Sequence, residues 1–323
     1  MAELINKTLP QIFLDRVAKC GDQVALREKD FGIWQRITWD QYLNHVKHFA
    51  LGLVTLGFQR GNHLAIISEN CKEWLYADLA CISLGGVTLG VYPTSPYPEV
   101  KYVVNHSDSV FIVCEDQEQT DKILEVIDDL PLLKKIIVKD MKGLRKYPKD
   151  RIVSFKEVEE LGRQLSKKSP SLYLEEVNKG NSEDICIMIY TSGTTGMPKG
   201  AARSTDFVKK DGVLDYVFGS MSFFNLGEDE VHLICCPIYH SAPSYFFLQT
   251  FMLGGTAVFM PKFDALEFLK VVEKYKVTST HLVPTMVTRL LDLPEEQTKD
   301  IDISSFRTAI VGAAPRSEER RVG

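Results

Sequence analysis

The chain lacks the features that mark several protein classes. Its 323 residues carry a net charge of −5 and contain no basic block, so nothing in the sequence supports nucleic-acid binding. Residues 1–7 hold no cationic segment followed by an apolar core, which argues against a signal peptide there. The composition, 45% hydrophobic and 25% charged, is that of a globular protein with room for two core-bearing units.

No C-x-x-C pair occurs among the cysteines. Their odd and dispersed number indicates reduced, buried thiols and a cytoplasmic compartment. Cys235 and Cys236 are adjacent, but successive strand residues point to opposite faces, so we expect them not to act as a redox or metal pair. The seven cysteines are Cys20, Cys71, Cys81, Cys114, Cys186, Cys235 and Cys236.

The longest uncharged stretch, residues 231–261, contains no Asp, Glu, Lys or Arg. Its length would allow a membrane span. However, Pro237, Pro243 and the pair Gly254-Gly255 interrupt it, so strand, turn, helix, turn and strand is the better interpretation. We therefore expect no transmembrane segment, and peripheral association with a membrane stays open.

Apolar strands alternate with amphipathic helices along most of the chain, which predicts an α/β fold with parallel sheets covered on both faces. Two such runs indicate two subdomains, at about residues 9–180 and 181–315, joined by the polar stretch 139–181. The expected strands are 63–67, 87–91, 110–113, 135–138, 231–236, 256–259, 279–282 and 308–311. The expected helices are 38–57, 72–84, 99–105, 117–130, 244–253, 265–275 and 286–291.

Residues 190–200, Tyr-Thr-Ser-Gly-Thr-Thr-Gly-Met-Pro-Lys-Gly, are rich in small hydroxyls and glycine and carry one cation. They follow the apolar run 185–189, as expected for a loop that leaves a strand. Exposed backbone N–H groups, hydroxyls and a lysine suit a polyphosphate, although composition alone also fits a flexible surface loop. Pro198 stands where a Walker A loop needs glycine, so a kinase-like P-loop is disfavoured.

This segment resembles the signature Y-T-S-G-T-T-G-x-P-K-G of the adenylate-forming (AMP-binding) enzymes, which include acyl-CoA synthetases, peptide-synthetase adenylation domains and luciferases. The resemblance implies that residues 9–315 form part of the large N-terminal domain of that family, with two packed, mostly parallel sheets flanked by helices in an αβαβα arrangement. It also implies that the ATP phosphates contact Thr191, Ser192, Gly193, Thr194, Thr195, Gly196 and Lys199.

Two later loops resemble further elements of the same family. Tyr239 and His240 fall on its P-x-[FY]-H element, which borders the carboxylate pocket, and His240 would gate that pocket or stabilise the negative charge that develops. Gly312, Ala313, Ala314 and Pro315 resemble its G-G-A-P element, which contacts adenine and the acyl group. His281–Met286 weakly resembles a V-P-T/S segment before a pocket-lining helix. The family's T-H pair after P-K-G is absent from Ala201–Thr205.

The implied reaction joins a carboxylic acid to ATP as an acyl-adenylate and then transfers the acyl group to coenzyme A. His240 and Lys199 are the expected catalytic residues, Mg²⁺ is expected on the phosphates, and no protein metal ligand is identified. A long-chain fatty acid is the favoured substrate. Alternatives are another acid–CoA ligase for aryl, medium-chain or carnitine-type acids, a peptide-synthetase adenylation domain, and a non-catalytic ATP-binding fragment. The lack of an acid in residues 238–243 disfavours an amino-acid substrate.

The resemblance stops near Pro315. The family's Y-G-x-T-E and Y-x-T-G-D elements, its hinge and its small C-terminal domain with a catalytic lysine do not follow, so we expect a truncated chain without full ligase activity. Residues 316–323, Arg-Ser-Glu-Glu-Arg-Arg-Val-Gly, replace the expected apolar helix start and can be encoded by a sequencing-adapter sequence. We expect this tail to be non-native, and the codons of the coding DNA would decide it.

Overall fold

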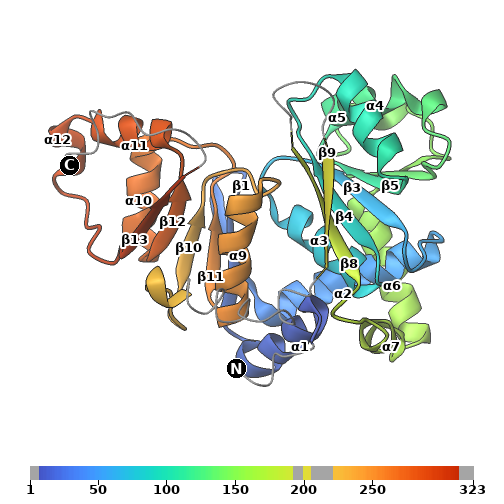
Figure 1. The fold of residues 1–323 in the computed structure, drawn as a ribbon, viewed down its shortest axis with the longest axis horizontal. Helices are drawn as coiled ribbons and strands as arrows, with labels where there is room; N and C mark the ends of the chain where they lie inside the picture. Colours follow the sequence, from blue (N-terminus) through green and yellow to red (C-terminus); the bar gives the residue numbers. More distant parts are fainter. Residues whose placement is uncertain (1–6, 192–198, 205–220, 313–323) are drawn as a thin grey trace. The chain divides into compact units, whose positions relative to one another are not determined.

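The computed structural model describes residues 7–191, 199–204 and 221–312. The described chain divides into two compact units, each with its own sheet (Figure 1). Unit 1 comprises residues 1–21 and 40–213, and unit 2 comprises residues 22–39 and 214–323. This division differs from the expected one, because an early segment of the chain belongs to the later unit and residues 181–213 belong to the earlier one.

Unit 1 contains a seven-stranded sheet in the order β7-β6-β5-β3-β4-β8-β9. Neighbouring strands are parallel except for β8 and β9, which are antiparallel. The strands are β3 (His63–Ile67), β4 (Val87–Val91), β5 (Ser109–Cys114), β6 (Lys135–Val138), β7 (Ile152–Ser154), β8 (Ile185–Thr191) and β9 (Lys199–Ser204). The helices are α1 (Leu9–Cys20), α2 (Trp39–Thr55), α3 (Lys72–Ser83), α4 (Tyr97–His106), α5 (Gln117–Leu124), α6 (Phe155–Lys168) and α7 (Leu172–Asn178), with short 3-10 turns at Ile127–Asp129 and Leu144–Lys146.

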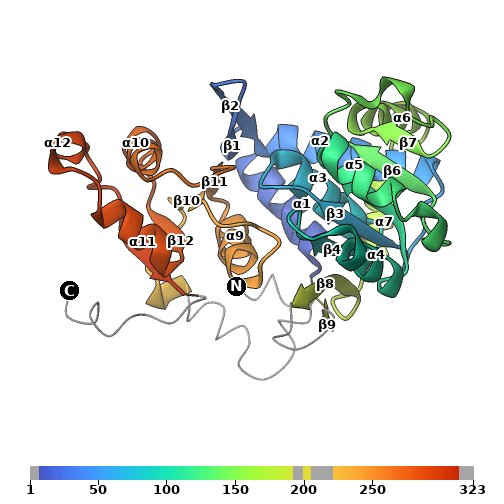
Figure 2. The ribbon, with the colours of Figure 1, turned by 90° about the horizontal axis from the view of Figure 1, so that it is seen from above.

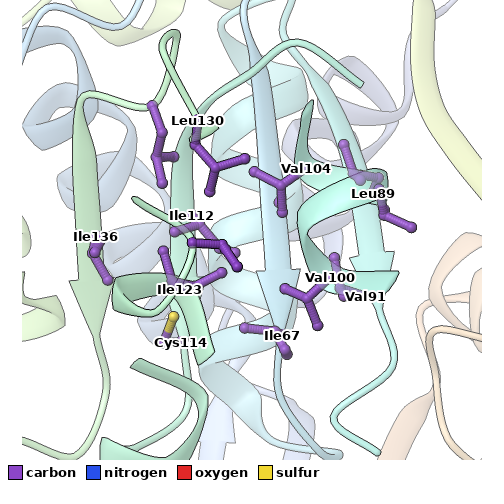
Figure 3. Close-up of a cluster of buried hydrophobic side chains, with 14 of the residues drawn as sticks. Ile67, Leu89, Val91, Val100, Val104, Ile112, Cys114, Ile123, Leu130 and Ile136 are labelled. Carbon is purple, nitrogen blue, oxygen red and sulfur yellow. The ribbon is translucent and has the colours of Figure 1, made fainter. Parts of the chain in front are cut away.

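The core of unit 1 explains why its central strands are mainly apolar. On one face, side chains of the strands pack against α4 and α5, with Ile112, Val100 and Ile123 fully buried (Figure 3). The alternate side chains, such as Leu64 and Phe111, are equally buried on the other face. Both faces of the sheet are therefore covered, as expected for parallel strands joined by helices.

Unit 2 contains a six-stranded sheet in the order β13-β12-β10-β11-β1-β2. Its strands are β1 (Val24–Asp30), β2 (Ile33–Thr38), β10 (Val231–Ile234), β11 (Thr256–Phe259), β12 (Ser279–Leu282) and β13 (Thr308–Val311). Its helices are α9 (Ser241–Leu253), α10 (Ala265–Tyr275), α11 (Pro284–Leu291) and α12 (Glu295–Thr298). In Figure 2, α9 lies on one side of this sheet and α10 and α11 on the other.

A buried polar network lies at the amino ends of the parallel strands of unit 2. The Glu230 side chain is completely buried and accepts hydrogen bonds from Ser279 Oγ and from Arg307, at 3.4 Å for the latter. Arg307 also holds exposed Asp229 with two bonds of 2.7 and 3.0 Å. The Glu230 charge is thereby compensated, as a buried carboxylate requires.

The expected elements are confirmed with shifted ends. The strand expected over 231–236 ends at Ile234, and the helix expected to reach residue 130 ends at Leu124 before a 3-10 turn. Strands β1 and β2 and helix α1 have no counterpart among the expected elements. The polar stretch 139–181 is not a simple connection, since it contains β7, α6 and α7.

Candidate functional site

The β8–β9 hairpin of unit 1 carries the hydroxyl- and glycine-rich segment. Strand pairing sets Thr191 opposite Lys199 and Tyr190 opposite Gly200, so the two ends of the segment lie side by side. The expected phosphate ligands Ser192, Gly193, Thr194, Thr195 and Gly196 lie outside the described residues. Lys199 is exposed and, within the described part of the chain, forms no ion pair.

Tyr190, to which the sequence comparison gives no role, anchors this hairpin. Its side chain is 5% exposed, and its hydroxyl lies 2.9 Å from Nδ1 of His106. The Tyr92 hydroxyl donates a hydrogen bond of 3.1 Å to the Tyr190 carbonyl. A Cβ on Gly200 would lie 3.0 Å from the Tyr190 ring, so this glycine lets β9 pass close to the ring. Burial raises the pKa of Tyr190, which keeps the hydroxyl protonated for these bonds.

In unit 2, His240 lies in the segment between β10 and α9. It is the N-cap residue of α9, and its backbone N–H donates to the Pro237 carbonyl at 3.1 Å, which closes a turn. The rings of Tyr239 and His240 have centroids 4.9 Å apart. The residue is exposed overall, yet desolvation of its ring, followed by the effect of His281, lowers the pKa of His240. Its imidazole is therefore neutral at pH 7 and can donate one hydrogen bond and accept another.

His281 on β12 is a residue whose position sequence reasoning missed. It is 4% exposed, its ring stacks on Phe246 of α9 at 5.7 Å, and its Nδ1 has no hydrogen-bond partner among the described residues. A Cβ on Gly312 would lie 3.7 Å from its Nε2. In the sequence, His281 appears only as one histidine in a strand of hydroxyl and aliphatic residues. That pattern does not show which residues surround its ring in the fold.

The carboxyl ends of β10, β12 and β13 thus bring together three of the loops that the sequence singles out. His240 and Gly312 both lie near His281, as Figure 1 shows for the elements that carry them. The other expected residues of the last loop, Ala313, Ala314 and Pro315, lie outside the described residues, as does the tail 316–323. Ligands of open parallel sheets bind at such carboxyl ends, so this is the candidate site of unit 2.

Two kinds of feature are absent from the described residues. No group of three or more His, Cys, Asp or Glu side chains in ranges 7–191, 199–204 and 221–312 is placed to hold a metal ion. No helix within the same ranges is long and apolar enough to cross a membrane. The uncharged stretch 231–261 is β10, α9 and β11 with their turns, as expected.

Curated proteins similar to this chain are fatty-acid–CoA ligases. The long-chain-fatty-acid–CoA ligase ACSBG2 of Xenopus laevis is 35% identical over 207 residues, which cover 64% of this chain and 27% of that protein. ACSBG1 of Bos taurus is 28% identical over 293 residues, which cover 90% of this chain and 39% of that protein. The chain therefore spans only about a quarter to two fifths of the length of these relatives.

Solved structures show the same fold. The luciferase-like enzyme of the mealworm Zophobas morio has a TM-score of 0.78 and 22% identity, over 97% of this chain and 68% of that one. The N-terminal domain of FACL13 from Mycobacterium tuberculosis has a TM-score of 0.77 and 20% identity, over 97% of this chain and 71% of that one. At these identities the likeness concerns the fold alone.

The family comparison completes the assignment. The sequence model of the AMP-binding enzyme family matches residues 13–321, which is nearly the whole chain. The two mostly parallel sheets flanked by helices are the architecture of the N-terminal domain of adenylate-forming enzymes. With its acyl-CoA ligase relatives and its β8–β9 hairpin, this chain belongs to the AMP-binding enzyme family and forms part of that N-terminal domain.

Proposed function

We propose that the protein to which this chain belongs activates a long-chain fatty acid with ATP and transfers the acyl group to coenzyme A. The observation that carries the proposal is the β8–β9 hairpin, which brings Thr191 opposite Lys199 around the phosphate signature. The names of the curated relatives support the fatty acid as the substrate.

In the first half-reaction, a carboxylate oxygen attacks the α-phosphorus of ATP, and the bond to the bridging oxygen of pyrophosphate breaks. The chain's task is to position the reactants and to compensate charge. Lys199 would neutralise the leaving pyrophosphate, while the N–H groups and hydroxyls of residues 191–196 would hold its oxygens. Mg²⁺ would be held mainly through phosphate oxygens.

In the second half-reaction, the thiol of coenzyme A attacks the acyl carbonyl and AMP leaves. We assign His240 to the side of the acyl carboxylate, where a neutral imidazole can donate a hydrogen bond to the oxygen that becomes negative. Its lowered pKa supports this role, because a protonated imidazole would instead form an ion pair with the free carboxylate that enters the first half-reaction. Gly312–Pro315 would contact adenine and the acyl group.

Carboxylate-dependent exchange of pyrophosphate into ATP tests the proposal on the full-length gene product. Acetate, aryl acids, medium-chain acids, long-chain acids and amino acids form the panel, and we expect the fastest exchange with a long-chain acid. Exchange confined to amino acids would identify a peptide-synthetase adenylation domain instead. The chain of 323 residues is assayed in parallel for ATP binding, and we expect binding without full ligase activity. Exchange confined to aryl or medium-chain acids would keep the adenylation chemistry but overturn the choice of substrate.

A further inference from the structure

The thiols of Cys235 and Cys236 converge, contrary to the expectation that they point to opposite faces. Strand β10 ends at Ile234, so the alternation of a regular strand does not extend to these residues. Both Sγ atoms are directed at the carbonyl oxygen of His281, at 3.5 Å from Cys235 and 3.4 Å from Cys236. The expected opposite orientation of the two side chains was wrong, because the expected strand extended two residues too far.

A third sulfur atom belongs to the same cluster. Sδ of Met286, in the first turn of α11, lies 3.7 Å from Sγ of Cys236. Cys235 and Cys236 are 5% and 3% exposed, and Oγ1 of Thr280 lies 3.5 Å from Sγ of Cys235. A metal ion bonded to three sulfurs at about 2.3 Å in a trigonal plane would hold them about 4 Å apart. The 3.7 Å between the Cys236 and Met286 sulfurs is close to this spacing, and the two thiols share the His281 carbonyl as a neighbour.

The protonation of the two thiols differs from that of an ordinary buried cysteine. The hydrogen bond from Cys235 lowers the pKa of Cys236 to about 5 despite burial, and the same bond raises the pKa of Cys235. Elsewhere in the chain, burial raises the pKa of Cys81, Cys114 and Cys186. A thiolate is the form of cysteine that binds soft metals.

We propose that Cys235, Cys236 and Met286 form a binding site for one soft monovalent metal ion, of which Cu(I) is the representative. Thiolate and thioether donors select Cu(I), whereas hard divalent ions prefer oxygen ligands. Binding forms two thiolate–metal bonds and one thioether–metal bond, and each thiol that is protonated beforehand releases its proton to solvent. No electron is transferred, because copper enters as Cu(I). An ion reaches the buried sulfurs when residues 235–240 open locally.

The site would connect two segments that also border the candidate functional site of unit 2. Cys236 lies four residues before His240, and Met286 follows the strand that carries His281. A bound ion would link the start of the β10–α9 segment to α11. The inference does not depend on the proposed ligase function, because it rests only on the three sulfur atoms.

Anaerobic titration of the purified chain with Cu(I), against a colorimetric Cu(I) chelator, tests this site without ATP or acid. We expect one tightly bound ion per chain and a sulfur-to-copper absorption band in the near ultraviolet. The substitutions Cys235→Ser and Cys236→Ser should each weaken binding by more than about tenfold, and Met286→Leu by a smaller factor. The matched control Cys114→Ser removes an equally buried thiol of unit 1 and should leave the affinity unchanged.

Circular dichroism of each variant checks that the fold is retained, and X-ray absorption of the copper complex counts the sulfur ligands directly. One tight equivalent remaining in the double variant C235S/C236S would overturn the site. So would a complex with nitrogen or oxygen ligands only, or an affinity that Cys114→Ser lowers as much as Cys236→Ser. An unchanged affinity in M286L would remove the third ligand and with it the three-sulfur site.

Discussion

At the scale of single residues, Lys199 is the side chain of unit 1 to which we assign the contact with the ATP phosphates. It is fixed opposite Thr191 by strand pairing, and its charge is exposed. Hydrogen bonds to charged groups contribute about 1.5–3 kcal/mol, which corresponds to about tenfold to a hundredfold in affinity. We therefore expect Lys199→Ala to raise the KM for ATP in pyrophosphate exchange by that factor while fatty-acid binding is retained.

The matched control for this prediction is Lys142→Ala, since the Lys142 side chain is 78% exposed and pairs only loosely with Asp140 at 3.7 Å. It should leave the KM for ATP unchanged. Equal losses of ATP and fatty-acid binding in Lys199→Ala would point to misfolding and contradict a phosphate role.

A second residue-scale prediction concerns His232, which is buried beside Ser279, with 2.7 Å between Nδ1 and Oγ. Burial, followed by the effect of His281, lowers the pKa of His232 to about 3 from its usual value near 6.5. The folded state therefore binds fewer protons than the unfolded state, so stability is lost as pH falls from about 6.5 towards 3. The loss is up to roughly 5 kcal/mol. The free energy of unfolding, measured in urea across this pH range, should depend less on pH in His232→Asn than in the unsubstituted chain. The same pH dependence in both chains would contradict the prediction.

At the scale of elements, two glycines allow helices α2 and α6 of unit 1 to pack closely together. A Cβ on Gly162 would lie 1.7 Å from the His48 carbonyl oxygen, and one on Gly52 would lie 2.0 Å from the Val158 carbonyl oxygen. Alanine at residue 162 would gain about 1 kcal/mol of helix propensity. Overpacking against backbone costs about 1–3 kcal/mol and more when nothing can move aside.

We expect Gly162→Ala to lower the free energy of unfolding by about 2 kcal/mol, measured by urea denaturation. Gln164→Ala changes an exposed residue of the same helix and should stay within about 0.5 kcal/mol of the parent chain. A higher free energy of unfolding in Gly162→Ala would contradict this prediction and show that α2 and α6 can move apart at little cost.

The sequence predicts some elements of the fold and misses others, α6 among them. Strands such as 256–259 and 279–282 were predictable because each is a short run bounded by turns. Helix α6 was missed because it buries only Phe155, Val158 and Gly162 among polar residues, and its capping box of Ser154 and Glu157 was overlooked. Helix α4 begins at Tyr97, two residues before the expected start, because Pro98 suits the first turn.

The candidate site was predictable in part, for a similar reason. Local spacing marks Lys199 and His240, since each lies in a segment that follows an apolar strand. The orphan Nδ1 of His281, its neighbour Gly312 and the shared target of the two cysteine thiols are tertiary contacts, which no local pattern contains. Tyr190 stands first in the signature, yet its anchoring contact with His106 joins residues 84 positions apart.

At the scale of the whole molecule, unit 2 is discontinuous in sequence. Residues 22–39 belong to unit 2, although the residues before and after them belong to unit 1. Gly21 and Asp40, which flank this segment, are in contact, since the Asp40 N–H donates to the Gly21 carbonyl at 2.9 Å. A short linker can therefore replace residues 22–39 without separating α1 from α2.

We expect residues 7–204 with 22–39 replaced by a Gly/Ser linker to fold cooperatively, because all seven strands of its sheet are present. Circular dichroism and urea unfolding measure the outcome. The same chain with 22–39 retained should be less soluble, since β1 then lacks β11. A featureless unfolding curve for the excised variant would show that unit 1 needs unit 2.

The pairing of β1 with β11 also bears on the order in which the molecule is made. Leu26 pairs with Ala257, so roughly 230 residues separate partners in adjacent strands. At about 5–20 residues per second, a ribosome needs roughly 10–50 s to deliver β11 after β1. Throughout that interval the nascent β1–β2 hairpin has one unsatisfied edge, which other chains could pair with. Unit 2 is therefore begun before most of unit 1 is made and is completed after it, and its yield in a cell should depend on how well this early hairpin is shielded during synthesis.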